Sequence, residues 1–132
     1  MGDRRERGRE IMREVLGEEY FNRRDKSTND FNAPLRCYSE RTCFGDAWDR
    51  PGLERRERSL ILLGMLTALN RPHELKTHVR AAVRNGLSVA EIQEVLYLTA
   101  VYCGLPAAVD SFRIAEETLR EMDLLAKEAP QG

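Results

Sequence analysis

Apolar residues recur along this chain at the three- and four-residue spacing of amphipathic helices, and no segment alternates as a strand would. In the first half, the pattern predicts a helix over residues 4–20, a polar linker over residues 22–29 and a second helical region over residues 30–48. Gly45 is a candidate break near the end of that second region.

After a turn at Pro51-Gly52, the helix expected over residues 53–69 begins with charged side chains and becomes apolar on nearly every side from Leu60 onward. A helix that is apolar all round is buried on more than one face. Because the chain is small, we expect part of this burial to come from another subunit.

Three further helices are expected, over residues 72–86, 88–104 and 106–122. The first and last of these begin at or near a proline, which suits the first turn of a helix. Ser88 and Glu91 have the spacing of a capping box, which predicts the start of the middle helix. The pattern therefore predicts an all-α protein of about six helices.

The chain has 132 residues, of which 42% are hydrophobic and 33% charged, a composition that is typical of a globular protein. This length predicts one domain over residues 1–132, with a core at about 8–122 and frayed termini, including the tail from Lys127. The 21 basic and 22 acidic residues leave a net charge of −1. No bulk positive field therefore attracts nucleic acid or an anionic membrane.

The N-terminus and the cysteines bear on the compartment. The first arginines alternate with acidic residues, and we interpret this stretch as a solvated helix with i,i+4 ion pairs. It has no apolar leader, and the least polar stretch, residues 95–109, is too short to span a bilayer. The three cysteines are an odd number without a Cys-x-x-Cys pair. This favours a reducing compartment, and we expect a cytoplasmic protein.

One of the two histidines stands beside an acidic residue on a predicted helix. Glu74 and His78 are four residues apart and so share a face, while Leu75 and Val79 mark the apolar side next to it. A carboxylate there would accept a hydrogen bond from the imidazole, fix its tautomer and raise its pKa, which suits proton transfer near neutral pH. From the pattern alone, an ion pair at the edge of the core is the simpler interpretation.

Two arginines, Arg50 and Arg58, flank the Pro51-Gly52 turn, and either can bind a carboxylate or form structural ion pairs. Cys103 ends an apolar helix, where we interpret its thiol as a small buried hydrophobic group. With two histidines and no cluster of carboxylates, we expect no metal site. The sequence also has no phosphate-binding glycine loop and no nucleophile elbow. If the chain is an enzyme, these absences predict that it works by proton transfer and electrostatic stabilisation.

Several characteristic segments stand in order over about residues 8–122. They are FGDAWDRPGL at residues 44–53 with RSL at 58–60, ELKTHVRAA at 74–82, NG at 85–86 with EIQEV at 91–95, and AVYCGLPAA at 100–108. REVLG at residues 13–17 and NDFN at residues 29–32 belong to the same set. Together these segments resemble the 4-carboxymuconolactone decarboxylase family.

The resemblance implies an all-α fold of the alkylhydroperoxidase-D type that assembles into homo-oligomers, either trimers or trimer-based hexamers. It also implies a cofactor-free decarboxylase of the protocatechuate (β-ketoadipate) branch of aromatic catabolism. The small lactone carboxylate 4-carboxymuconolactone would be converted to 3-oxoadipate enol-lactone and CO2. On this hypothesis His78, oriented by Glu74, delivers a proton or stabilises the oxyanion. The candidate substrate-binding residues are Arg50, Arg58, Trp48 and Cys103.

Two alternatives remain open on the same scaffold. Leu98 and Val109 stand at positions that are polar in many members of the family that the chain resembles, which favours a different lactone or keto acid as substrate. A non-catalytic oligomeric or ligand-binding protein is the other alternative. The thiol-based peroxidase activity known for this fold needs a Cys-x-x-Cys pair, which the sequence lacks.

Overall fold

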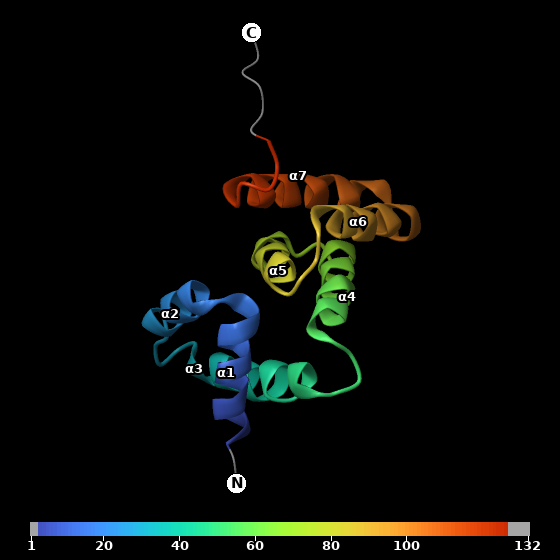
Figure 1. The fold of residues 1–132 in the computed structure, drawn as a ribbon. Coiled ribbons are helices and arrows are strands. Elements are labelled where there is room, and N and C mark those ends of the chain that lie inside the picture. Colours follow the sequence, from blue (N-terminus) through green and yellow to red (C-terminus); the bar gives the residue numbers. More distant parts are fainter. Residues whose placement is uncertain (1–2, 127–132) are drawn as a thin grey trace. The chain divides into compact units, whose positions relative to one another are not determined.

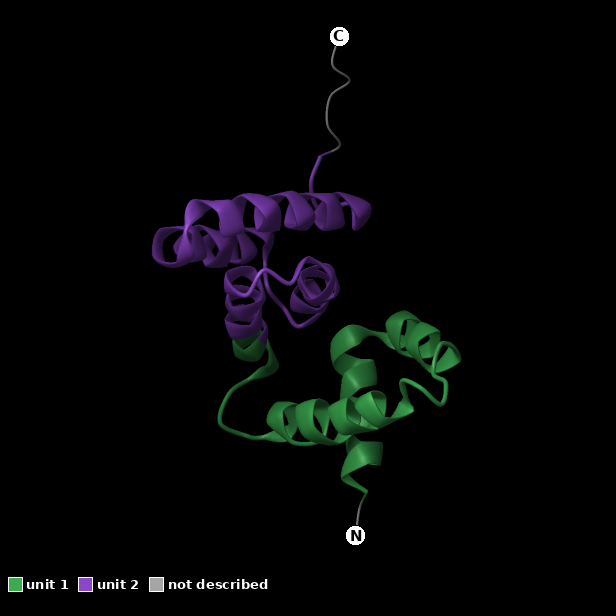
Figure 2. Cartoon of the chain, turned by 180° about the vertical axis from the view of Figure 1, so that it is seen from behind, with its two compact units in different colours: residues 1–58 green, residues 59–132 purple. Residues whose placement is uncertain are grey.

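The computed structural model describes residues 3–126, and all regular structure within them is helical (Figure 1). Seven α-helices and two short helices of other types occur in this part of the chain. The all-α class is therefore confirmed. The chain divides into two compact units, residues 1–58 and residues 59–132 (Figure 2). The fraying predicted from Lys127 onward lies outside the described residues.

Unit 1 (residues 1–58) begins with α1 (Arg4–Leu16) and α2 (Glu18–Lys26). The single helix predicted over residues 4–20 is wrong, because Gly17 interrupts it with a φ of 97°. Glycine adopts this conformation far more readily than other residues, because it has no Cβ atom. The linker predicted over residues 22–29 is also wrong over its first part, which is helical and follows the buried Phe21.

The second helical region of unit 1 forms as expected and consists of three short elements. They are α3 (Ala33–Ser39), the π-helix η1 (Glu40–Phe44) and the 3-10 helix η2 (Ala47–Asp49). The N–H of Gly45 donates to the carbonyl of Glu40 at 2.8 Å, and η1 ends there. Gly45 is therefore a break, as predicted.

Two glycines allow α1 to lie against η1 in backbone contact. A Cβ added to Gly8 of α1 would overlap the carbonyl of Glu40, and one added to Gly45 would overlap the carbonyl of Arg4. A larger residue at either position would force the two backbones apart. This close approach places Glu40 directly beneath the arginine-rich helix α1.

Unit 2 (residues 59–132) contains most of α4 (Arg55–Ala68), then α5 (Pro72–Arg84), α6 (Val89–Cys103) and α7 (Leu105–Glu121). The apolar core joins all four helices through Leu63, Leu75, Val79, Ile92, Leu96, Ala115 and Leu119, among others. Figure 1 shows α7 running back along α6.

The helix boundaries predicted in unit 2 are confirmed to within one or two residues. Gly86 has a φ of 101° after α5. The Ser88 hydroxyl accepts from the N–H of Glu91 at 3.1 Å, and the Glu91 carboxylate accepts from the N–H of Ser88 at 3.0 Å. Both halves of the capping box are therefore present.

The apolar helix α4 is only partly covered within the chain. Leu63 and Thr67 are buried, but Ile61 and Met65 are 48% and 49% exposed, and Leu69, directly after the helix, is 60% exposed. On α6, Tyr97, Leu98, Val101 and Tyr102 are exposed as well.

None of the described helices is both long enough and apolar enough to cross a membrane.

Candidate active site

The candidate proton-transfer residues lie on α5, whose first turn contains Pro72. Leu75 and Val79 on this helix are fully buried in the core of unit 2. His78 is half-buried beside this apolar face, and Glu74, one turn earlier, is exposed. The spacing that the sequence shows therefore does bring the carboxylate and the imidazole to neighbouring positions.

Burial dominates the electrostatics of His78. It lowers the pKa of the imidazole to about 4, and the negative charge of Glu74 raises that pKa by a smaller amount. The net increase toward neutrality expected from Glu74 is therefore wrong, because the carboxylate is exposed to water while the imidazole is desolvated. Among the described residues, no hydrogen bond joins Glu74 to His78. At neutral pH the imidazole is uncharged.

The two candidate arginines lie in unit 1 and differ in their partners. Arg58 donates from Nη2 to the carbonyl of Arg50 at 2.8 Å and from Nη1 to the carbonyl of Leu53. Its guanidinium therefore braces the loop between them. The exposed side chain of Arg50 has no hydrogen bond or ion pair to any residue within 3–126. The structure therefore distinguishes Arg50 from Arg58 by their hydrogen-bond partners, which the sequence could not do.

The remaining candidates, Trp48 and Cys103, have simple surroundings. Trp48 in unit 1 is half-buried and stacks on Phe44, with ring centroids 6.0 Å apart and an interplanar angle of 16°. Cys103, the last residue of α6 in unit 2, is exposed. Its interpretation as a buried hydrophobic side chain is therefore wrong. None of the three cysteines forms a disulfide.

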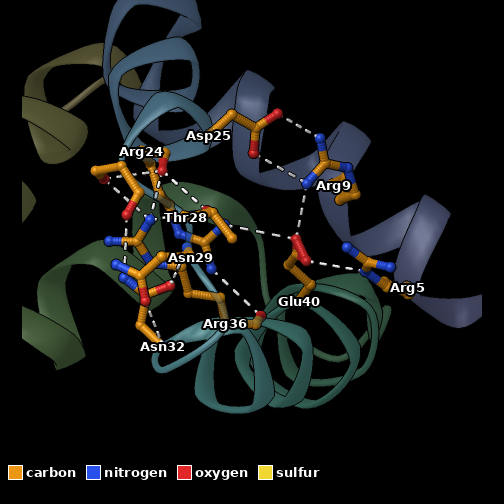
Figure 3. A network of polar contacts seen from close by, with 10 residues as sticks. Arg5, Arg9, Arg24, Asp25, Thr28, Asn29, Asn32, Arg36 and Glu40 are labelled. Atoms are coloured by element: carbon orange, nitrogen blue, oxygen red, sulfur yellow. Dashed lines mark hydrogen bonds and ion pairs between the residues drawn. The ribbon is translucent and has the colours of Figure 1, made fainter.

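Sequence reasoning missed a charged cluster in unit 1 that is centred on Glu40 (Figure 3). This carboxylate is 1% exposed and lies 3.0 Å from Nε of Arg5, 2.9 Å from Nη1 of Arg9 and 3.5 Å from Nη1 of Arg24. Burial alone would raise the pKa of Glu40, but the hydrogen bonds from Arg5 and Arg9 outweigh it and lower the pKa. The carboxylate therefore stays ionised although it is buried.

The arginines of α1 are for the most part not the locally paired solvated residues that the sequence suggested. Arg9 forms a two-pronged ion pair with Asp25 of α2, at 3.1 and 2.6 Å, in addition to its contact with Glu40. Of the arginines in this stretch, Arg7 does have a local pair, with Glu10. The one available sign in the sequence was the i,i+4 spacing of Arg5 and Arg9, which puts them on one face.

The described part of the chain contains no preformed set of metal ligands. No three His, Cys, Asp or Glu side chains within residues 3–126 gather closely enough to hold an ion. The candidate groups for proton transfer on α5 stay the imidazole of His78 and the carboxylate of Glu74.

The chain is similar to known proteins over most of its length. Residues 38–117 match the model of the carboxymuconolactone decarboxylase family. A 4-carboxymuconolactone decarboxylase of Acinetobacter baylyi is 38% identical over 92% of this chain and 90% of its own length. A nitrosuccinic acid decarboxylase of Metarhizium robertsii is 33% identical over 87% of this chain and 80% of its own. An uncharacterised 15.0 kDa protein of Paracoccus denitrificans is 34% identical over 61% of each chain. This chain belongs to the carboxymuconolactone decarboxylase family.

Proposed function

We propose that this protein is a carboxy-lyase that converts 4-carboxymuconolactone to 3-oxoadipate enol-lactone and CO2. The similarity to the Acinetobacter baylyi decarboxylase extends over nearly the whole of both chains, which supports this substrate. The structural observation that carries the proposal is the half-buried, neutral imidazole of His78, one helical turn after Glu74.

The reaction needs a way to stabilise negative charge and to return a proton. When the carbon–carbon bond to the carboxylate breaks, its electron pair stays on the substrate. The pair spreads through the ring alkene onto the carbonyl oxygen of the lactone. The resulting dienolate takes up one proton on carbon, and that proton comes ultimately from solvent. Hydrogen-bond donors placed at the developing oxyanion lower the barrier for such a step.

A neutral His78 suits these tasks in a definite order. Its N–H can donate to the dienolate oxygen as charge develops, at a site where burial strengthens the interaction. The negative charge that builds up on this oxygen as CO2 leaves also raises the pKa of the ring, so the imidazole gains affinity for a proton. His78 is then the proposed relay that passes a solvent proton to carbon, and Glu74 favours the charged form of the ring.

Arg50 is the arginine that we assign to a substrate carboxylate. Its guanidinium has no acceptor among the described residues, and the forked donors of arginine match a carboxylate. Arg58 is assigned to holding the backbone of the loop that carries Arg50, through its hydrogen bond to the Arg50 carbonyl. Trp48 and Cys103 stay candidates for contacts with the substrate.

We also propose that the protein is a homo-oligomer, a trimer or a hexamer. The exposed apolar side chains of α4 and α6, such as Ile61, Met65 and Tyr97, support this assembly. Sedimentation equilibrium would measure its mass. A monomer at all concentrations would contradict the proposal.

The experiment that tests the activity measures CO2 release from enzymatically prepared 4-carboxymuconolactone. In His78→Ala we expect kcat to fall at least about 100-fold, because the proposed donor and relay is removed. His73→Ala, an exposed histidine of the same helix, is the matched control and should leave kcat unchanged. A folded wild-type protein without turnover would contradict the proposed substrate.

One observation favours a second candidate, the decarboxylation of a different acid. The relative from Metarhizium robertsii is named for nitrosuccinic acid, and a nitro group, like a lactone carbonyl, can accept the electron pair left by CO2. Nitrosuccinic acid should therefore be assayed beside the lactone with the same two variants. Turnover of that acid alone, lost in His78→Ala, would support the second candidate against the first. If neither acid is turned over, a non-catalytic role is favoured.

A further inference from the structure

Unit 1 contains a cavity that the proposed reaction does not use. It has a volume of about 270 Å³ and lies among α1, α3, η1 and the end of α2. Its lining includes the basic residues Arg5, Arg9 and Arg36, the acidic residues Asp25 and Glu40, and Ala33. Figure 3 draws the polar side chains of this cluster together around Glu40.

The cluster around the cavity carries more positive than negative charge. Four guanidinium groups stand against two carboxylates in the contacting set of Arg5, Arg9, Arg24, Arg36, Asp25 and Glu40. Glu40 alone faces three of these arginines. Like charges held close together and partly out of water repel one another strongly. An additional anion in the cavity would relieve this excess.

Several arginine donors next to the cavity are unused. Arg5 contacts Glu40 through Nε, and its two terminal nitrogens have no protein acceptor within residues 3–126. Arg36 contacts the Arg24 carbonyl and the hydroxyls of Ser27 and Thr28, all through Nη1. Its Nη2 is likewise without an acceptor in the described part of the chain. These donors are therefore available to a ligand of the cavity.

We propose that the arginine-lined cavity of unit 1 binds a small oxyanion, a carboxylate or a phosphate. Planar, forked guanidinium donors bind both groups with charge-assisted hydrogen bonds. The cavity volume is slightly below that of pockets for drug-sized ligands, which favours a small anion. None of the lining residues is among those assigned to the decarboxylation, so this inference does not depend on the proposed function.

Calorimetric titration of the full chain with sodium phosphate, and separately with sodium succinate, tests the proposal against sodium chloride at matched ionic strength. We expect saturable binding of one anion per chain. Arg5→Gln should weaken that binding about tenfold, since it removes charge-assisted hydrogen bonds. Ala33→Leu should weaken it as well, because the larger side chain takes up part of the cavity while every charge is kept. Arg4→Gln, the same change of charge on the same helix but outside the lining, should bind as the wild type does.

The outcomes decide between a site and general attraction. Saturable binding of phosphate alone or of succinate alone assigns the ligand to that class, and binding of both assigns a general oxyanion site. No saturable binding of either anion overturns the proposal. So does unchanged binding by a folded Ala33→Leu protein, or an equal loss in Arg4→Gln. If circular dichroism shows that Arg5→Gln does not fold, Ala33→Leu decides alone.

Discussion

The two units of this protein each remove a titratable side chain from water, with opposite results. In unit 1 the buried Glu40 keeps its negative charge, because three arginines surround it and lower its pKa. In unit 2 the half-buried His78 gives up its positive charge, because the nearby Glu74 is exposed and too weak to compensate for desolvation. Burial disfavours the charged form in both cases, and the number and placement of partners decide which form persists.

The two units also differ in the number of buried hydrophobic residues that form the core of each. Unit 2 has a contiguous core drawn from four helices. The buried hydrophobic residues of unit 1 are fewer: Ile11, Met12, Val15, Phe21 and Phe44. Unit 1 should therefore depend on its charged cluster, while unit 2 depends on its packing and can keep an uncharged histidine for chemistry.

The largest stability effect is expected from Glu40→Gln. Removal of the buried charge leaves Arg5, Arg9 and Arg24 without their shared partner, and breaking such an ion cluster costs about 3 kcal/mol. Urea denaturation at fixed protein concentration should show the loss as a lower midpoint. An unchanged midpoint would mean that the charged cluster does not hold unit 1 together.

The pH dependence of stability separates the two units. The pKa of His78 falls from 6.5 to about 4 on folding, so the unfolded chain binds more protons between these values. Its stabilising contribution is complete above about pH 6.5 and is lost as the pH falls toward 4, by at most about 3 kcal/mol. The lowered pKa of Glu40 acts at lower pH, where stability is lost as the pH falls below the ordinary carboxyl value of 4.5.

Urea midpoints between pH 8 and pH 3 check this separation. His78→Gln should flatten the upper part of the profile, and Glu40→Gln should flatten the lower part. A wild-type profile that is flat from pH 7 to pH 5 would contradict the desolvation of His78.

A smaller effect is expected from Gly8→Ala, which tests the close crossing in unit 1. The added methyl group would overlap the Glu40 carbonyl, and the resulting separation of α1 from η1 should cost about 2 kcal/mol. Gly52→Ala is the control, because nothing lies within 4 Å of a Cβ added there. Equal melting temperatures for the two variants would show that this crossing tolerates a side chain.

The smallest effect is expected at Glu121, the counterpart of Glu40 on the surface of unit 2. Glu121 pairs with Lys76 at 3.2 Å and with Arg80, but its side chain is 45% exposed. Water screens such pairs, so Glu121→Gln should leave the urea midpoint unchanged. A loss as large as that of Glu40→Gln would show that burial does not distinguish the two glutamates.

Much of unit 2 could be predicted, because residues close to each helix end determine where its helices begin and end. The capping box at Ser88 and Glu91 and the left-handed stop at Gly86 each act within a few residues. In unit 1, the apolar spacing of Ile11, Val15 and Leu16 suggested one helix over residues 4–20, where the structure has two that meet at Gly17. The polar sequence after Phe21 gave little sign that α2 would form around this buried ring.

By itself, the sequence determined the all-helical fold and the placement of Glu74 and His78 one turn apart, because helical periodicity is a local property. Only the tertiary structure decided the charge on His78, since desolvation depends on the helices that cover the ring. It also decided the partners of the first arginines, since Arg5 and Glu40 are 35 residues apart in the chain. Contacts at that separation exist only after the backbones cross at Gly8, which no local pattern reports.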